Sequence, residues 1–201
     1  TMAFLIGAIA DEFTNATRGE IGTIATLELF SISVLSIIIS RNIHLINMKI
    51  FFVVGVLVVA LGHLITVYSP NLEIVYIARI IAGIGSGIIV ATIMANVAKA
   101  QNAQMTFALI NSGVGAAGVL LSLVIPRVIS HYGMDGAYLI HFIFSLFGFM
   151  FLMLIPSRRN LDSKNKSVKI YKGKLGWIAM FGVAFAFFAH GGLLTFSERI
   201  G

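Results

Sequence analysis

Long apolar stretches separated by short polar ones make up most of the sequence, and they predict membrane-spanning helices. A helix needs about 20 mostly apolar residues to cross the hydrocarbon core of a bilayer. Stretches of about this length predict spans at 21–40, 50–68, 72–98, 105–125, 136–155 and 175–197. A shorter apolar stretch at 1–10 is about half that length, and we expect it to be the second half of a further span. The predicted fold class is an all-α membrane protein.

The polar stretches between these spans are short, with one exception. We expect one end of the bundle to carry loops at 11–20, 69–71 and 126–135, and the other end to carry 41–49 and 99–104. The exception is 157–174, which is long and rich in lysine. We interpret it as a linker between two bundles, and a binding site for anionic lipids is the alternative. The predicted organisation is therefore a transmembrane bundle at 1–156, a basic linker at 157–174 and the start of a second bundle at 175–201.

Lysine and arginine are distributed unevenly between the two sets of loops, and this predicts the orientation. One set carries ten of these residues: Arg41, Lys49, Lys99, Arg158, Arg159, Lys164, Lys166, Lys169, Lys172 and Lys174. The other set carries three, namely Arg18, Arg127 and Arg199. Cytoplasmic loops of membrane proteins carry the excess of basic residues. We therefore expect 157–174 to be cytoplasmic.

Composition narrows the function classes. The chain has 201 residues, of which 58% are hydrophobic and 11% charged, whereas soluble domains have about 25% charged residues. The net charge of +6 does not indicate nucleic-acid binding, because the basic residues concentrate in one loop. There is no cysteine, no phosphate-binding loop and no paired-histidine metal motif. We expect no enzyme activity, no cofactor and no metal site.

One predicted span, 72–98, combines a charge with closely spaced glycines. Arg79 lies within it, and a charged side chain in hydrocarbon costs about 2.5–3.5 kcal/mol on insertion scales. We therefore expect Arg79 to face protein or water. Gly83 and Gly87 follow at steps of four on the same helical face, with Gly85 between them. Glycines at such positions let a neighbouring backbone come close, so we expect tight helix packing there.

The segment Arg79-Ile-Ile-Ala-Gly83-Ile-Gly85-Ser-Gly87 resembles the fourth-helix motif of the major facilitator superfamily. The start of 136–155, Gly-Ala-Tyr-Leu-Ile, is similar to the usual sixth helix, and 21–29 resembles a second helix of one bacterial group. The resemblance covers essentially the whole chain as the first six-helix bundle, with an incomplete first helix, plus helix seven. The loop 40–49 departs from the family pattern, because it lacks the usual acidic residue and glycines.

The resemblance implies secondary transport of a small solute by alternating access. It implies a multi-pass protein with the lipid bilayer and a small-molecule substrate as partners, and we expect the bacterial cytoplasmic (inner) membrane. The first, second, fourth, fifth and seventh spans would line a central path, while the third and sixth would face lipid. A non-transporting seven-helix receptor or scaffold is the alternative. A retinal-binding pump is disfavoured because no lysine follows Lys174 in the last span.

Five residues are candidates for chemistry. Glu28 and Arg79 lie about equally deep in their spans, although depth alone does not show that they touch. If they meet, they form either a permanent structural pair or a proton-carrying site. A lone carboxylate in hydrocarbon would be neutralised, whereas a carboxylate beside Arg79 would be held ionised. His63, His141 and His190 could form a relay, but we expect each to be a hydrogen-bonded interface residue. His190 is the best placed, because Gly191 and Gly192 follow it in a pathway helix.

Overall fold

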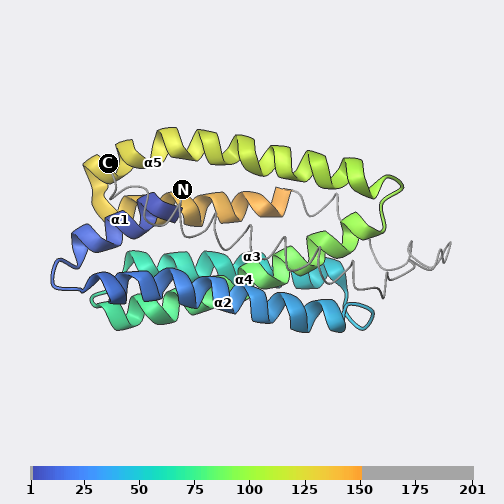
Figure 1. Ribbon diagram of the computed structural model, residues 1–201, viewed down its shortest axis with the longest axis horizontal. Helices are drawn as coiled ribbons and strands as arrows, with labels where there is room; N and C mark the ends of the chain where they lie inside the picture. The colour runs from blue at the N-terminus through green and yellow to red at the C-terminus, as the bar shows by residue number, and fades with distance from the viewer. Residues whose placement is uncertain (1, 151–201) are drawn as a thin grey trace, which may run out of the picture.

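The computed structural model describes residues 2–150, and within this part of the chain the only regular structure is helical. The helices are α1 (Met2–Glu12), α2 (Arg18–Arg41), α3 (Met48–Val67), α4 (Leu72–Ala98) and α5 (Ala103–Phe147). They lie roughly along one long axis and form an elongated bundle (Figure 1). The connections between them gather at the two ends of that bundle, in the two sets expected from the sequence.

Four of these helices are long and apolar enough to cross a membrane: α2, α3, α4 and the segment 103–150. Their bounds match the predicted spans to within three residues at the ends of α2, α3 and α4. The bundle therefore confirms the expected all-α membrane fold. The predicted linker 157–174 and the last span 175–197 lie outside the described residues.

Polar side chains at the helix starts explain where the helices begin. Asn47, Asn71 and Asn102 each accept a hydrogen bond from a backbone N–H in the first turn of α3, α4 and α5. Thr17 and Glu20 bond each other's backbone N–H groups reciprocally at the start of α2. Such caps satisfy donors that have no partner inside the helix, which matters most where little water is present.

The predicted loop at 126–135 is wrong, because the chain stays helical past Pro126. Helical geometry continues to the neighbourhood of Gly133, where φ is 59° and ψ is −151°. The chain then reverses and returns along the bundle (Figure 1). Proline is tolerated within membrane helices when neighbouring groups satisfy the freed carbonyl. The backbone angles of Gly133 are essentially restricted to glycine, so this residue, not the proline, makes the turn.

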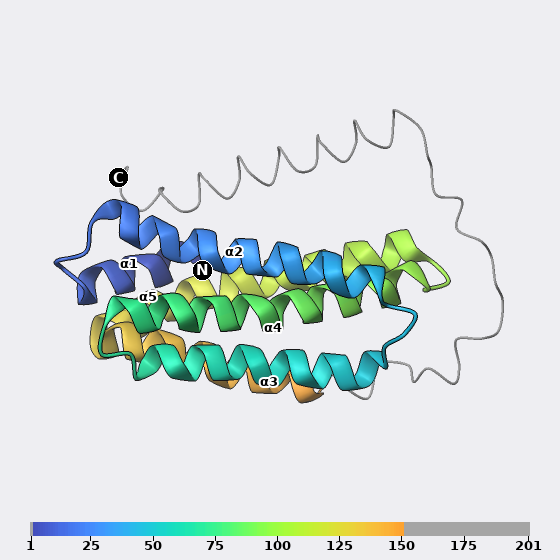
Figure 2. The same cartoon turned by 90° about the horizontal axis from the view of Figure 1, so that it is seen from below.

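Helix α4 lies between α2 and α3 (Figure 2), and its glycines set both contacts. A Cβ atom at Gly83 would lie 2.5 Å from the carbonyl oxygen of Glu28, and one at Gly87 would lie 2.7 Å from that of Ile32. On the other side, a Cβ at Gly85 would lie 2.6 Å from the backbone N of Val59. Gly83 and Gly87 therefore face α2, while Gly85 faces α3. Side chains at these positions would force the helices apart.

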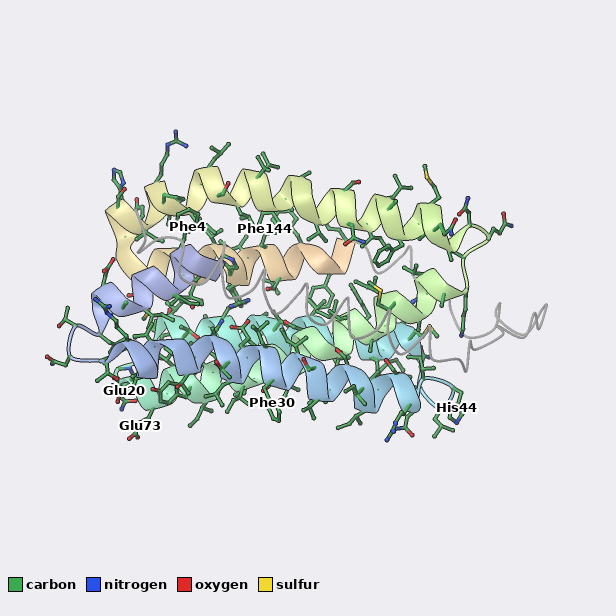
Figure 3. The ribbon with its side chains drawn as sticks, in the orientation of Figure 1. Phe4, Glu20, Phe30, His44, Glu73 and Phe144 are labelled. Atoms are coloured by element: carbon green, nitrogen blue, oxygen red, sulfur yellow. The ribbon has the colours of Figure 1, made fainter. Side chains whose placement is uncertain are left out.

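Apolar side chains fill the end of the bundle at which α1 and α2 connect. The buried residues there come from α1, α2, α4 and both halves of α5, and they include Leu5, Ile9, Ile24, Val75, Ile125 and Tyr138. Towards the surroundings the helices present large apolar side chains such as Phe30, which points away from the bundle in Figure 3. An apolar exterior is what a lipid-facing surface requires.

We predict that Gly85→Ala destabilises the protein by about 1–3 kcal/mol, the usual cost of overpacking a tight core. The added methyl group would meet backbone atoms of α3, which cannot rotate away. The measurement is the unfolding midpoint of the protein in detergent.

Gly115→Ala is the matched control, because no described atom lies within 4 Å of a Cβ at that position of α5. Alanine there should be neutral or stabilising by about 0.5–1 kcal/mol. Equal effects of the two substitutions would contradict the packing described for α4.

Candidate functional site

The side chain of Arg79 is the most deeply buried charge of the described residues, with 1% of its surface exposed. It extends from α4 towards α3. Its Nη2 donates to the hydroxyl of Thr66 at 2.6 Å and to the carbonyl oxygen of Gly62 at 3.0 Å. Hydrogen bonds to charged groups are about twice as strong as neutral ones. Arg79 is thus held firmly by one turn of α3.

His63, on the same turn of α3, provides a third partner. Its Nδ1 lies 3.4 Å from both Nη1 and Nη2 of Arg79. A guanidinium has only N–H donors and no acceptor. Nδ1 of His63 must therefore be the unprotonated nitrogen, so the ring is neutral and carries its proton on Nε2.

An aromatic ring covers the guanidinium from the returning half of α5. The Cζ atom of Arg79 lies 4.6 Å from the ring centroid of Tyr138, which is itself buried. A cation over an aromatic face is stabilised by about 2 kcal/mol or more when water is excluded. The charge is therefore balanced in part by a ring and not only by carboxylate.

Glu28 approaches Arg79 from α2, and its contact is looser than those from α3. Its Oε2 lies 3.7 Å from Nη1 of Arg79, and 15% of its side chain is exposed. That distance is within ion-pair range but beyond a good N–H···O hydrogen bond. The arginine is thus fixed by α3 and α5, while the carboxylate is attracted to it from the side.

His141 completes the cluster. Its ring centroid lies 5.5 Å from that of His63 and 6.4 Å from that of Tyr138. Its Nδ1 lies 2.9 Å from the carbonyl oxygen of Ala137, one helical turn earlier. Two histidines from separate helices therefore meet beside the guanidinium.

The structure brings Glu28 and Arg79 together, and it places Gly83 directly against the backbone of Glu28. His190 lies outside the described residues. Within residues 2–150 no group of three or more His, Cys, Asp or Glu side chains could hold a metal ion. The arrangement can hold a positive charge, pair it with a carboxylate and exchange protons at a carboxylate or an imidazole.

Sequence reasoning missed the contributions of α3 and of the returning half of α5, which were expected to face lipid. The signal was present as polar residues at helical spacing. His63 and Thr66 lie three residues apart, as do Tyr138 and His141, so each pair shares a helix face. Polar groups on one face of an apolar helix favour protein over lipid as their neighbour.

The family model of the Major Facilitator Superfamily matches residues 1–201, which is the whole chain. The chain belongs to the major facilitator superfamily. Its members transport solutes across membranes and are not enzymes. The protein is accordingly an integral, multi-pass membrane protein with a small-molecule substrate. No curated protein and no solved structure matches it.

We predict that Thr66→Val destabilises the protein by about 1.5–3 kcal/mol more than Thr92→Val, because only Thr66 bonds a charged group. Both threonines are fully buried, and both hydroxyls donate to a carbonyl four residues earlier, at 2.9 Å and 2.8 Å. The difference between the two variants therefore isolates the bond from Arg79. Unfolding free energies in detergent measure it, and equal losses would show that Thr66 does not hold the guanidinium.

Proposed function

We propose that this superfamily member moves a small solute by alternating access and that proton movement is coupled to transport through Glu28 and Arg79. The observation that carries the proposal is the asymmetry of the contacts around the guanidinium. Arg79 has two short hydrogen bonds and a ring on one side, and a carboxylate at 3.7 Å on the other.

A fixed cation next to a loosely held carboxylate suits proton exchange. Since Arg79 is secured by α3 and α5, its position does not depend on the charge of Glu28. Protonation of Glu28 would remove the attraction between the two side chains without leaving the guanidinium unbonded. The contrast is an arginine whose only hydrogen-bond partner is a carboxylate. Loss of that carboxylate would leave a buried, unbonded charge, so such a pair would be a structural element.

The partial exposure of Glu28 supports the same role. A proton carrier must be reached by water or by substrate in at least one state of the transporter. With 15% of its side chain exposed, Glu28 lies at the margin of the cluster, whereas Arg79 is enclosed. Because few charges lie along the helices, we infer a small amphipathic or singly charged solute as substrate.

Orientation and location belong to the same proposal. One end of the bundle carries Arg41, Lys49 and Lys99, and those basic residues favour the cytoplasmic side for that end. The opposite end of the bundle, which carries Arg18 and Glu73, would then face outward. The membrane would be the inner membrane of a bacterium.

The experiment is proton release from the purified full-length protein on addition of small organic acids and lipophilic cations. We expect a ligand that binds the wild type to release or take up protons, and Glu28→Gln to bind it with at least tenfold less proton movement. The glutamine side chain has nearly the same shape as glutamate but cannot ionise, so the variant reports the effect of the charge at residue 28 alone. Glu73→Gln is the control, because Glu73 is exposed at the start of α4.

Unchanged ligand-linked proton movement in Glu28→Gln would make Glu28 a structural partner of Arg79. The search for the coupling residue would then turn to His190. A protein that binds no transported solute in any assay would favour the receptor or scaffold alternative.

A further inference from the structure

We propose that His141 is a second proton-binding site of this protein and that its neighbour His63 stays neutral to accept hydrogen bonds from Arg79. The role of this site in transport rests on the proposed function, but its protonation can be measured without any substrate. The inference follows from the partners of two ring nitrogens, Nδ1 of His63 and Nδ1 of His141.

His63 cannot take up a proton without losing its contacts. Its Nδ1 faces two N–H groups of Arg79 at 3.4 Å, so a proton on Nδ1 would place three donors against one another. The ring is buried, and the guanidinium beside it repels a second positive charge. His63 is therefore locked as the neutral tautomer with its proton on Nε2.

His141 has the opposite arrangement. Its Nδ1 lies 2.9 Å from the carbonyl oxygen of Ala137, which can only accept, so Nδ1 carries the proton. In the neutral ring Nε2 is then the basic nitrogen. A proton can add to its lone pair while the bond to Ala137 is kept, and no bond between heavy atoms forms or breaks. The side chain of His141 is also half-buried, whereas that of His63 is buried.

The charges around His141 come from each packed helix. His63 of α3 presents a neutral ring, and Tyr138 lies one turn earlier on α5. Arg79 of α4 contacts both of these rings, and Glu28 of α2 pairs with the same guanidinium. The charged residues of α1, Asp11 and Glu12, are exposed. The cluster thus contains one cation, one carboxylate and one imidazole that can still be protonated.

The two proton sites should oppose each other. A proton on His141 adds positive charge near Arg79 and therefore favours the ionised form of Glu28. Conversely, a proton on Glu28 removes the negative charge that favours the protonated form of His141. Uptake at one site therefore promotes release at the other. The protonated site of the cluster can therefore change from Glu28 on α2 to His141 on α5, or back, while Arg79 stays in place.

The test is nitrogen NMR of the full-length protein labelled with ¹⁵N-histidine, recorded from about pH 5 to pH 8, where imidazoles titrate. His44→Gln, His131→Gln and His190→Gln assign the signals of the described outer histidines and of His190 by their loss, and His141→Gln separates the signal of His141 from that of His63. His63 should show Nε2–H with a bare Nδ1 at every pH. His141 should show Nδ1–H at high pH and a proton on both nitrogens at low pH.

A His141 signal that stays neutral across this range, or a His63 signal that titrates instead, would overturn the inference. His141→Gln adds a second readout, since the glutamine removes the proton site and should lower the proton uptake of the substrate-free protein on acidification by about one proton. Glu28→Gln should leave the tautomer of His63 unchanged. Unchanged proton movement in Glu28→Gln therefore refutes the proposed coupling, whereas a His141 that does not titrate refutes only the second proton site.

Discussion

The rest of the structure depends on keeping a guanidinium inside an apolar bundle. Burying a cation is costly unless it is hydrogen-bonded and its charge is balanced. Here α3 supplies a hydroxyl, a carbonyl and an imidazole nitrogen, α5 supplies an aromatic face, and α2 supplies a carboxylate. Arg79 therefore connects four helices through contacts that each have a different chemistry.

Close helix packing makes this arrangement possible. Arg79 reaches the backbone of α3 because Gly62 has no side chain there, and a Cβ at Gly62 would lie 2.7 Å from the backbone N of Ala82. On the other side, Gly83 lets the backbone of Glu28 approach α4. The glycines and the charge are thus parts of one feature. The helices come close where the arginine needs partners.

Much of this could be predicted from sequence. The bounds of α4 followed from apolar length, and the equal depth of Glu28 and Arg79 followed from their positions in the spans. Their contact is shown by the structure. The position of the turn before the sixth helix was predicted wrongly, because Pro126 is the stronger turn signal in the sequence whereas the chain turns at Gly133. Thr66 and Tyr138 were missed because spacing gives the face of a helix but not the neighbour that covers it. For the same reason, the meeting of His63 with His141 was only one of two alternatives, a relay, and was not the expected one.

The most direct test of the central claim, that the charge of Arg79 favours the ionised form of Glu28 while α3 holds Arg79 in place, is infrared spectroscopy of the purified protein during acidification. The carbonyl stretch of a buried protonated carboxyl group should grow in the wild type and be missing in Glu28→Gln. In Arg79→Gln it should grow at a higher pH, since the neighbouring cation is gone. The same band at the same pH in wild type and Arg79→Gln would contradict the account.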